Sequence, residues 1–330
     1  MSSIDDKYNM FFKPKTTQYG SHMIMDNVRK QNKYKYINID SRYRDEYHHY
    51  TNSNLNLISN QADNASFSIT LPERINDVKS MTVSNIELPN TMYNISINND
   101  NSYFKVIDGN TEHIIIIDDG NYKANSNSNS NSNSNSNNNA VGGSIENAIN
   151  NKLSQLNLNI SFNVNDNDVT TITSTSAYTV VFDINQTGIN DKYNFKSKLG
   201  WILGFRNTFY DVNSTNSITS ECFSNFNVFK YVFLSIEDFT QNTQNSFVGP
   251  LFSSLINKNI ISRISLDKEK YPFGSVIPAS INNGLLISNK REYSGKIDIQ
   301  KLNFSLLNEE GKPIIINGMD YSFCIEVEYE

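Results

Sequence analysis

The sequence predicts a mainly β protein built on an antiparallel β-sandwich, and three features lead to this prediction. The 330 residues include 19 Phe and 18 Tyr but only seven Ala, so strand formers far outnumber the best helix former. Several segments alternate apolar and polar residues with the period of two that is typical of a half-buried strand. Long polar loops separate these segments, whereas parallel strands would need regular helices between them. A helical bundle and a mostly disordered chain are therefore excluded.

The composition sets further limits on the class of protein. Asn accounts for 53 residues, and an AT-rich genome encodes Asn, Ile, Tyr, Phe and Lys, so part of this bias reflects the genome. No apolar run approaches the roughly 18 residues of a membrane span, and the N-terminus lacks a signal-peptide core. Two cysteines, Cys222 and Cys324, cannot form a disulfide framework. We expect a soluble protein made in a reducing compartment.

The N-terminal segment is expected to be a flexible arm over residues 1–35, because it shows no sustained strand or helix period. Residues 1–50 hold nine Lys and Arg against six Asp and Glu, whereas the rest of the chain holds 19 against 28. Basic residues mixed with tyrosines can bind an acidic protein face or nucleic acid, and a solvated tail is the alternative. The low pI of about 5.3 argues against a dedicated nucleic-acid binder, so no specific nucleic-acid binding is predicted. The candidate partner contacts here are Arg29, Lys30, Arg42, Tyr43 and Arg44.

The first strands follow the arm. Residues 36–40 are predicted to form a short strand, and residues 66–71 alternate until Pro72. Over residues 78–88 the apolar parity slips by one near Asn85, which indicates a β-bulge.

An insertion with helix and strands is predicted over residues 111–206. Asn125–Asn139 is an Asn-Ser repeat that can bury nothing, so we expect a disordered, solvent-exposed loop. A helix is predicted over about residues 144–156, with Ser144 as its N-cap. Residues 160–184 are predicted to hold three short strands.

The only tryptophan, Trp201, lies between Gly200 and Gly204 in the apolar segment LGWILGFR. A Trp in such a segment packs into a core or serves as an exposed anchor for a partner, since Trp and Arg dominate interface hot spots. In the second case Arg206 is its companion, and both residues are candidate partner contacts.

The C-terminal part shows the clearest strand patterns. Residues 228–236 are apolar on both faces, as in a central strand, and residues 260–266 form another strand. The parity changes between Ile299 and Leu302, which predicts a second bulge, and residues 321–329 alternate without interruption. We assign residues 36–110 and 207–330 to the sandwich.

The sequence contains no motif of a known catalytic, metal or cofactor site. The phosphate-binding, dinucleotide-binding, zinc-protease and nucleophile-elbow patterns are all absent. His48 and His49 are expected in a polar loop, and Asp118 and Asp119 before Gly120 are expected in a turn. We therefore predict no catalytic, metal or cofactor residues, and no enzyme.

Several segments resemble a family of virion-associated structural proteins of mimivirus-like giant nucleocytoplasmic DNA viruses. They include INIDSRYRD (37–45), the segment 67–96, DGNY (119–122), LGWILGFR (199–206), YVFLSIEDF (231–239) and the tail 293–330. The resemblance implies a minor capsid or capsid-associated protein with a jelly-roll sandwich. It implies a virion location after synthesis in the host cytoplasm, with other virion proteins as partners. The major capsid protein is one candidate partner, and further copies of this chain, in a homo-oligomer, are another.

Three function classes follow from the sequence. The first is a structural protein of a virus particle. The second is a surface module that recognises a glycan or host receptor, with loop tyrosines Tyr47, Tyr50 and Tyr210 as candidate contacts. The third, an enzyme with two carboxylates, has no supporting pattern.

Overall fold

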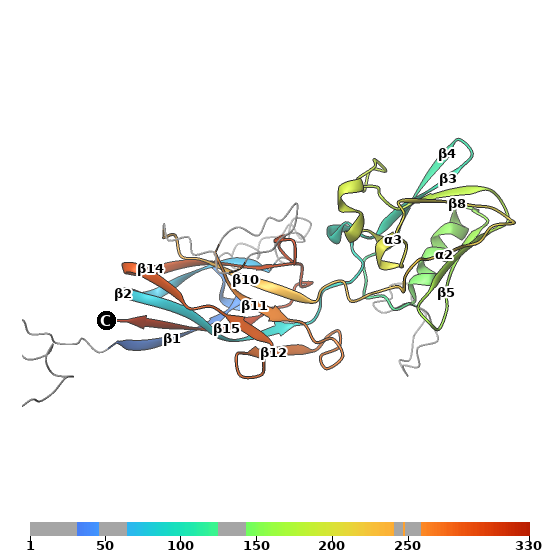
Figure 1. The fold of residues 1–330 in the computed structure, drawn as a ribbon. Coiled ribbons are helices and arrows are strands. Elements are labelled where there is room, and N and C mark those ends of the chain that lie inside the picture. Colours follow the sequence, from blue (N-terminus) through green and yellow to red (C-terminus); the bar gives the residue numbers. More distant parts are fainter. Residues whose placement is uncertain (1–31, 46–64, 125–142, 241–246, 248–258) are drawn as a thin grey trace, which may run out of the picture.

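The structure is a computed structural model that describes residues 32–45, 65–124, 143–240, 247 and 259–330 (Figure 1). Every pairing between its named strands is antiparallel, which confirms the predicted fold class. The arm residues 1–31, the Asn-Ser repeat 125–139, and His48, His49, Tyr47 and Tyr50 lie outside the described residues.

An eight-stranded sheet forms the sandwich, which we call the base. Its strand order is β1-β15-β2-β14-β10-β11-β13, and β12 pairs with β2. The strands are β1 (Lys33–Asp40), β2 (Ser66–Pro89), β10 (Tyr231–Glu237), β11 (Ile260–Ser265), β12 (Val276–Ser280), β13 (Leu286–Ser288), β14 (Arg291–Leu307) and β15 (Ser322–Tyr329).

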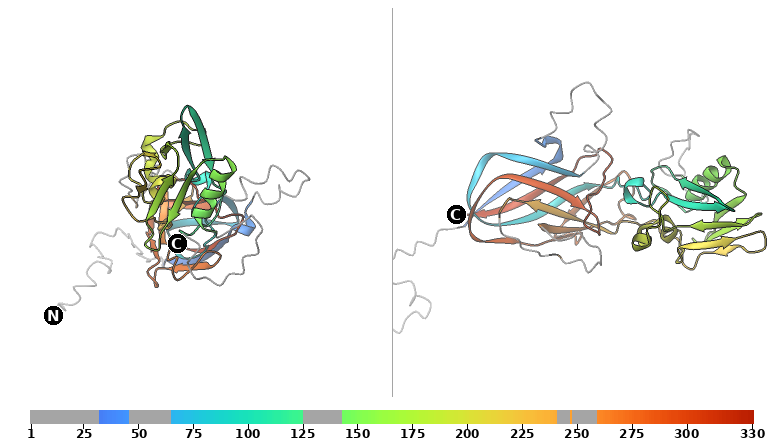
Figure 2. Two further views of the ribbon diagram at one scale, coloured as in Figure 1. Left: turned by 90° about the vertical axis from the view of Figure 1, so that its right-hand side faces the viewer. Right: turned by 90° about the horizontal axis from the view of Figure 1, so that it is seen from above.

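Strand β2 belongs to both halves of the base. It has 24 residues, and β14 pairs with its first part while β15 and β12 pair with its second part. The sheet curls over so far that β13 comes back into contact with β2 (Figure 2). The curled sheet is a jelly-roll-like sandwich, as the resemblance implied. Its core includes Phe67, Met81, Leu234, Phe304 and Phe323.

Both predicted bulges are present. Cys324 pairs with Asn85 and Ile325 pairs with Val83, so Ser84 is an extra residue in β2. In β14 the register shifts after Ile299, and the side chains of both Ile299 and Leu302 are buried. A change of parity in the apolar pattern therefore located each bulge correctly, because a bulge turns the next side chain to the other face.

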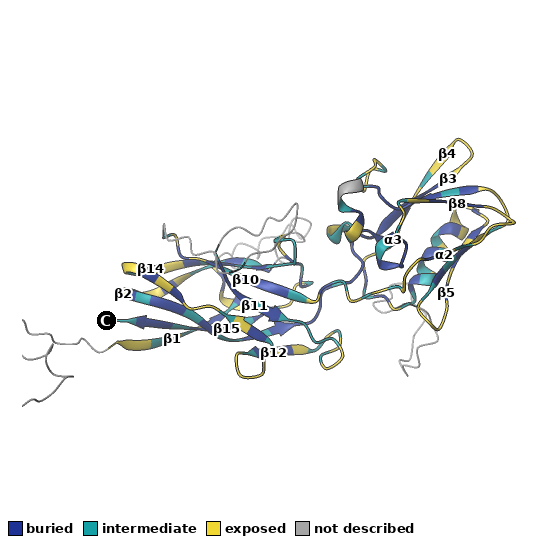
Figure 3. Cartoon of the chain, in the orientation of Figure 1, coloured by how far each residue is buried: buried dark blue, intermediate teal, exposed yellow. Residues whose placement is uncertain are grey.

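Strand β15 confirms its predicted alternation, since Phe323, Ile325 and Val327 are all buried. Its neighbour β1 begins at Lys33, so residues 33–35 belong to a strand, although the sequence assigned them to the arm. They pair with Tyr329, Glu328 and Val327, and this pairing explains the difference. Strand β1 lies at the sheet edge and is mostly exposed (Figure 3), so its own residues show little apolar pattern.

The residues between β2 and β10 form a second body, which we call the inserted body. Two sheets, β4-β3-β7-β8 and β5-β6-β9, enclose its core together with two short helices. Its elements are η3 (Ile97–Asn99), β3 (Tyr103–Asp108), β4 (Thr111–Ile116), α2 (Ile145–Gln155), β5 (Ile160–Val164), β6 (Thr170–Ser174), β7 (Tyr178–Val181), η4 (Lys192–Ser197), α3 (Leu199–Ile202), β8 (Phe209–Val212) and β9 (Ile218–Thr219).

Strands β3, β8 and β9 differ from the sequence assignment, which placed residues up to 110 and from 207 in the sandwich. Strand β3 pairs with β4 and β7, β8 pairs with β7, and β9 pairs with β6. The β3–β4 turn contains Gly109 with a φ of 57°, a backbone conformation that suits glycine. Alternation identified strands in the sequence, but it did not identify their partners.

Helix α2 confirms the prediction of a helix after the Asn-Ser repeat. The Ser144 hydroxyl accepts a hydrogen bond from the Asn147 N–H at 3.5 Å, which caps the N-terminus. Ile145, Ile149 and Leu153 lie on one face of the helix and are buried in the core of the inserted body.

The inserted body lies at one end of the base, and the C-terminus and the start of β1 lie at the opposite end (Figure 1). One chain segment after β2 and another before β10 connect the two bodies (Figures 1 and 2). None of the helices in the described ranges is both long and apolar enough to cross a membrane.

Candidate functional site

Two glycines fix the position of Trp201. A Cβ atom on Gly200 would lie 2.4 Å from Cγ of Phe182, so only glycine lets α3 pack this closely on the core. Gly204 has a φ of 95°, and a Cβ there would lie 2.1 Å from the Cys222 carbonyl oxygen. Together they allow the chain to turn sharply after α3 and bring Arg206 back beside Trp201.

Arg206 stacks on Trp201, with its guanidinium carbon 3.9 Å from the centroid of the indole ring. Its Nη1 donates hydrogen bonds to the carbonyl oxygens of Trp201 at 3.1 Å and Phe205 at 2.9 Å. The Phe195 ring meets the indole edge-on at 5.8 Å, and Lys196 Nζ lies 5.9 Å from the ring centroid. Trp201 is half-buried, so it packs against the core and also reaches the surface. Its role as a partner contact stays a prediction.

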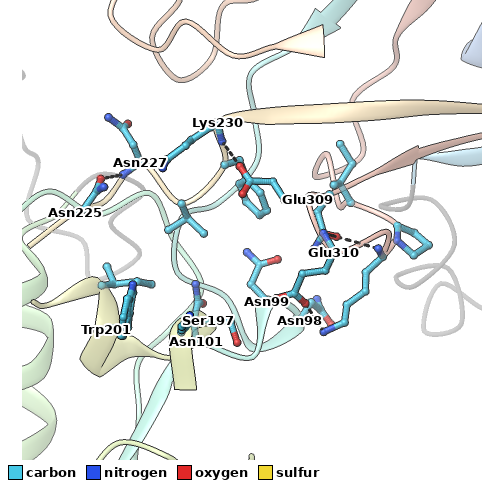
Figure 4. A pocket seen from close by; sticks show the side chains of 18 of the residues that line it. Asn98, Asn99, Asn101, Ser197, Trp201, Asn225, Asn227, Lys230, Glu309 and Glu310 are labelled. Atoms are coloured by element: carbon cyan, nitrogen blue, oxygen red, sulfur yellow. Dashed lines mark hydrogen bonds and ion pairs between the residues drawn. The ribbon is translucent and has the colours of Figure 1, made fainter. Parts of the chain in front are cut away.

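Trp201 and Arg206 line a pocket of about 280 Å³ between the inserted body and the base (Figure 4). Four regions of the chain form its walls: the η3 loop, the segment from η4 to Arg206, the segment before β10, and the turn after β14. The polar side chains among them are Asn98, Asn99, Asn101, Lys196, Ser197, Arg206, Asn225, Asn227, Lys230, Asn308, Glu309, Glu310 and Lys312. We call this hollow the interbody pocket.

The interbody pocket is lined by more cationic than anionic side chains. Four cationic side chains, Lys196, Arg206, Lys230 and Lys312, meet only two carboxylates. Glu310 forms an ion pair with Lys312 at 2.9 Å, and Glu309 accepts a hydrogen bond from the Lys230 backbone N–H at 3.0 Å. The pocket therefore carries an excess of positive charge, and it suits an anionic group.

A buried lysine holds two walls of the interbody pocket in place. Lys198 is fully buried, and its Nζ lies 2.6 Å from Asp100 Oδ2 and 3.1 Å from Asp191 Oδ2. Burial raises the pKa of the Asp191 carboxyl, but hydrogen bonds from Asn194 and Lys198 outweigh it and leave the pKa below its ordinary value. Asp100 follows η3 and Lys198 precedes α3, so the ion pair joins the η3 loop to the segment that bears Trp201.

The sequence did not indicate this buried cluster or the other pocket cations. Lys198 and Asp100 are 98 residues apart, and no spacing motif connects them. Lys196 is close to Trp201 in the sequence, so this proximity could have indicated it as a further candidate contact. Lys230 directly precedes β10 and is distant from Trp201 in the sequence, so no such signal existed for it.

The second group of predicted contacts lies on the base, beside β1. Arg42 is exposed and forms an ion pair with Asp40, and this hydrogen-bonded partner lowers the pKa of the Asp40 carboxyl. Tyr43 is 73% exposed. Arg44 is buried, and it donates from Nη2 to Asp320 at 2.9 Å and from Nε to the Ser41 carbonyl at 2.8 Å. Arg42 and Tyr43 thus face solvent, whereas Arg44 stabilises the short helix η1 (Ser41–Tyr43).

The structure therefore separates the predicted contacts into two places. Trp201 and Arg206 lie together on the inserted body, and Arg42 and Tyr43 lie together on the base. Arg29 and Lys30 lie outside the described residues. Tyr210, expected as an exposed loop contact, is instead buried in β8, where its hydroxyl donates to Glu221 at 2.7 Å.

No family model and no curated protein sequence matches the chain. Two solved structures of virus proteins are similar to it in fold. The mavirus penton protein is 10% identical, with 90% of this chain and 100% of that chain covered and a TM-score of 0.41. A chain of the Sputnik virophage structure is 12% identical, with 90% of this chain and 98% of that chain covered and a TM-score of 0.37. Both likenesses are distant, and we rest no functional argument on them.

Proposed function

We propose that this chain is a structural subunit of a giant-virus particle, a minor capsid or capsid-associated protein that contacts other virion proteins. Its role is structural and not catalytic, and its location is the virion after synthesis in the host cytoplasm. The major capsid protein and further copies of this chain are the candidate neighbours. The proposal extends the sequence resemblance, and the arrangement of the two bodies supports it.

The observation that carries the proposal is the placement of the chain ends relative to the inserted body. Strand β1 starts at the end of the base that is remote from the inserted body, and the C-terminus lies there as well (Figure 1). We propose that this end of the base is anchored in the shell and that the inserted body projects from it.

The surface beside this anchoring end is suited to contacts with a neighbour. Tyr34 is 56% exposed and Tyr36 is 65% exposed, both in the first half of β1, whereas Arg42 and Tyr43 follow the other end of the strand, where Asp40 pairs with Ser322. Tyr and Arg are enriched where proteins bind each other, because they combine apolar area with hydrogen bonding. Strand β1 also has no strand neighbour on its outer side within the described ranges.

We also propose that the base and the inserted body are separate folding domains. Each body has its own apolar core, and the strands of one do not pair with the strands of the other in the described residues. Expression of residues 95–227 alone tests this division. A cooperative thermal transition of the isolated fragment is expected, and a fragment without one contradicts the division.

The test of the structural role is the protein content of purified particles. Particles from independent preparations are washed at physiological ionic strength and are then analysed by quantitative mass spectrometry. We expect the same ratio of this chain to the major capsid protein in every preparation. Absence of the chain from the particles, or a ratio that varies between preparations, would contradict the proposal.

A further inference from the structure

Three cations of the interbody pocket have no carboxylate partner among the described residues. Lys196, Arg206 and Lys230 all line the pocket, and none of them forms an ion pair there. Lys196 and Lys230 are exposed and Arg206 is half-buried, whereas the buried cations Lys105, Lys198 and Arg291 each pair with an acid. The positive charge at this pocket is thus left unneutralised by the protein itself.

Arg206 is held in position before any ligand arrives. The indole ring of Trp201 supports one face of its guanidinium, and Nη1 is fixed by two backbone carbonyls. Its Nε and Nη2 groups have no hydrogen-bond acceptor in the described part of the chain. A guanidinium fork matches the oxygen atoms of a carboxylate or sulfate, and fixing it in advance lowers the entropy cost of binding.

Side-chain amides line the same pocket. Asn98 and Asn227 make no side-chain hydrogen bond to described residues, and Asn225 uses only its oxygen, which accepts from the Asn227 N–H at 3.0 Å. Figure 4 shows Asn225 and Asn227 on the wall formed by the segment before β10 and Asn98 on the opposite wall. Amides of this kind can both donate to and accept from hydroxyl groups.

The size of the pocket limits the ligand. A volume of about 280 Å³ lies just below the range of roughly 300–1,000 Å³ that is usual for small-molecule sites. It accommodates a single ring with its substituents and leaves no room for a folded peptide. On the inserted body, the Lys198–Asp100 ion pair fixes the distance between the wall formed by the η3 loop and the wall that bears Trp201.

We propose that the interbody pocket binds one acidic sugar residue, a hydroxylated ring that carries a carboxylate or a sulfate. Arg206, Lys196 and Lys230 bind the acidic group, and the amides of Asn98, Asn225 and Asn227 bind the hydroxyls. This gives a site to the second sequence hypothesis, recognition of a glycan, and it is independent of the structural role proposed above. A carboxylated and a sulfated sugar share this chemistry, and the test separates them.

The test is a titration of the full-length protein with four probes, followed by calorimetry or ligand-observed NMR. The probes are 3′-sialyllactose, which carries a carboxylate, lactose 3′-sulfate, which carries a sulfate, lactose and sodium sulfate. We expect one of the two acidic saccharides to bind more tightly than lactose and more tightly than sulfate. The saccharide that binds identifies the acidic group.

Matched variants locate the site. Lys196→Gln and Lys230→Gln each remove an exposed charge from the pocket, and Lys301→Gln removes an exposed charge from β14 on the base. Each pocket variant should weaken binding about tenfold, as the loss of one charge-assisted hydrogen bond does, and Lys301→Gln should not change it. The proposal would be overturned if neither acidic saccharide bound, or if lactose or sulfate alone bound as tightly as the acidic saccharides. It would also be overturned if Lys301→Gln weakened binding as much as the pocket variants do.

Discussion

At the residue scale, the base depends on one buried charged cluster at the end of β10. Arg291 donates from Nη1 to Asp238 Oδ2 at 2.9 Å and to the Ile236 carbonyl at 2.8 Å. The Tyr293 hydroxyl donates to the same Asp238 oxygen at 2.6 Å. All three side chains are buried, so each polar group relies on the others in place of water.

Replacing Arg291 should therefore destabilise the protein strongly. Arg291→Met leaves the Asp238 carboxylate buried without its cation, which typically costs about 3–5 kcal/mol. The control is Arg74→Met, which breaks an exposed ion pair with Asp298 and should cost less than about 1 kcal/mol. Urea unfolding of both variants measures the difference. Equal losses in the two variants would show that the buried cluster is no more important than a surface pair.

Asp238 should also make the stability depend on pH in the acid range. Burial raises the pKa of its carboxyl, but hydrogen bonds from Thr240 and Tyr293 and the charge of Arg291 outweigh burial, so the pKa lies below 3.8. The ionised group hence favours the folded state above pH 3.8, and this contribution is lost as the pH falls through the lowered pKa. The stability difference between the wild type and Asp238→Asn should narrow as the pH falls below 3.8. A difference that stays constant would contradict the assigned pKa direction.

At the element scale, local sequence patterns predicted most helices and strands, but they did not predict which strands pair with each other. The Ser144 cap and the apolar spacing of α2 lie within one short segment, as do the alternation of β15 and the parity changes in β2 and β14. The pairing of β3 with β7 joins segments more than 70 residues apart, and alternation carries no information about that choice.

The same limit applied to the candidate site. Trp201 and Arg206 were predicted together because they are close in the sequence, and the structure places them in contact. Lys230 and Asn98 joined the interbody pocket only through the packing of the two bodies. The sequence identified Arg44 as a basic residue, but it did not show that Asp320 would form an ion pair with it.

The connection between β4 and α2 should tolerate shortening. The described residues on its two sides are joined, because the Lys123 N–H donates to the Gly143 carbonyl at 3.1 Å and the Ile145 N–H donates to the Lys123 carbonyl at 2.9 Å. Deletion of Asn125–Asn139 removes no apolar side chain, and loop length changes closure entropy only logarithmically. We expect the melting temperature to change by less than about 4 °C, which corresponds to roughly 1 kcal/mol or less.

Differential scanning calorimetry measures this effect. A matched deletion of the β3–β4 turn residues Gly109 and Asn110 should be far more harmful, since it shortens a tight hairpin. A large drop in melting temperature after removal of the Asn-Ser repeat would show that the repeat contributes to the packing of the inserted body.

At the scale of the whole molecule, the basic N-terminal segment should contribute to assembly. Residues 1–35 were predicted to form an arm, and because β1 begins at Lys33 the appropriate truncation removes residues 1–31. Fully extended, 31 residues can reach about 100 Å, which is enough to cross a neighbouring subunit. We expect the truncated protein to keep its melting temperature but to bind other particle proteins more weakly.

Salt distinguishes a charge-driven contact from an apolar one. Binding by the full-length chain should weaken as salt rises, because exposed charges are screened beyond about 8 Å at physiological ionic strength. A pull-down at low and high salt compares the two forms. Equal and salt-independent binding by both would refute a role for the arm and move the contact to the faces of the base or to Trp201.

The most direct test of the proposed role compares the two ends of the molecule in intact particles. One epitope tag replaces Asn125–Asn139 on the inserted body, and a second tag follows Glu330 at the anchoring end of the base. Antibody binding is measured on intact particles and again after the shell is opened. We predict that the tag on the inserted body is accessible on intact particles, whereas the C-terminal tag becomes accessible only after opening. Equal accessibility of both tags on intact particles, or the reverse order, would contradict a subunit anchored in the shell by its base.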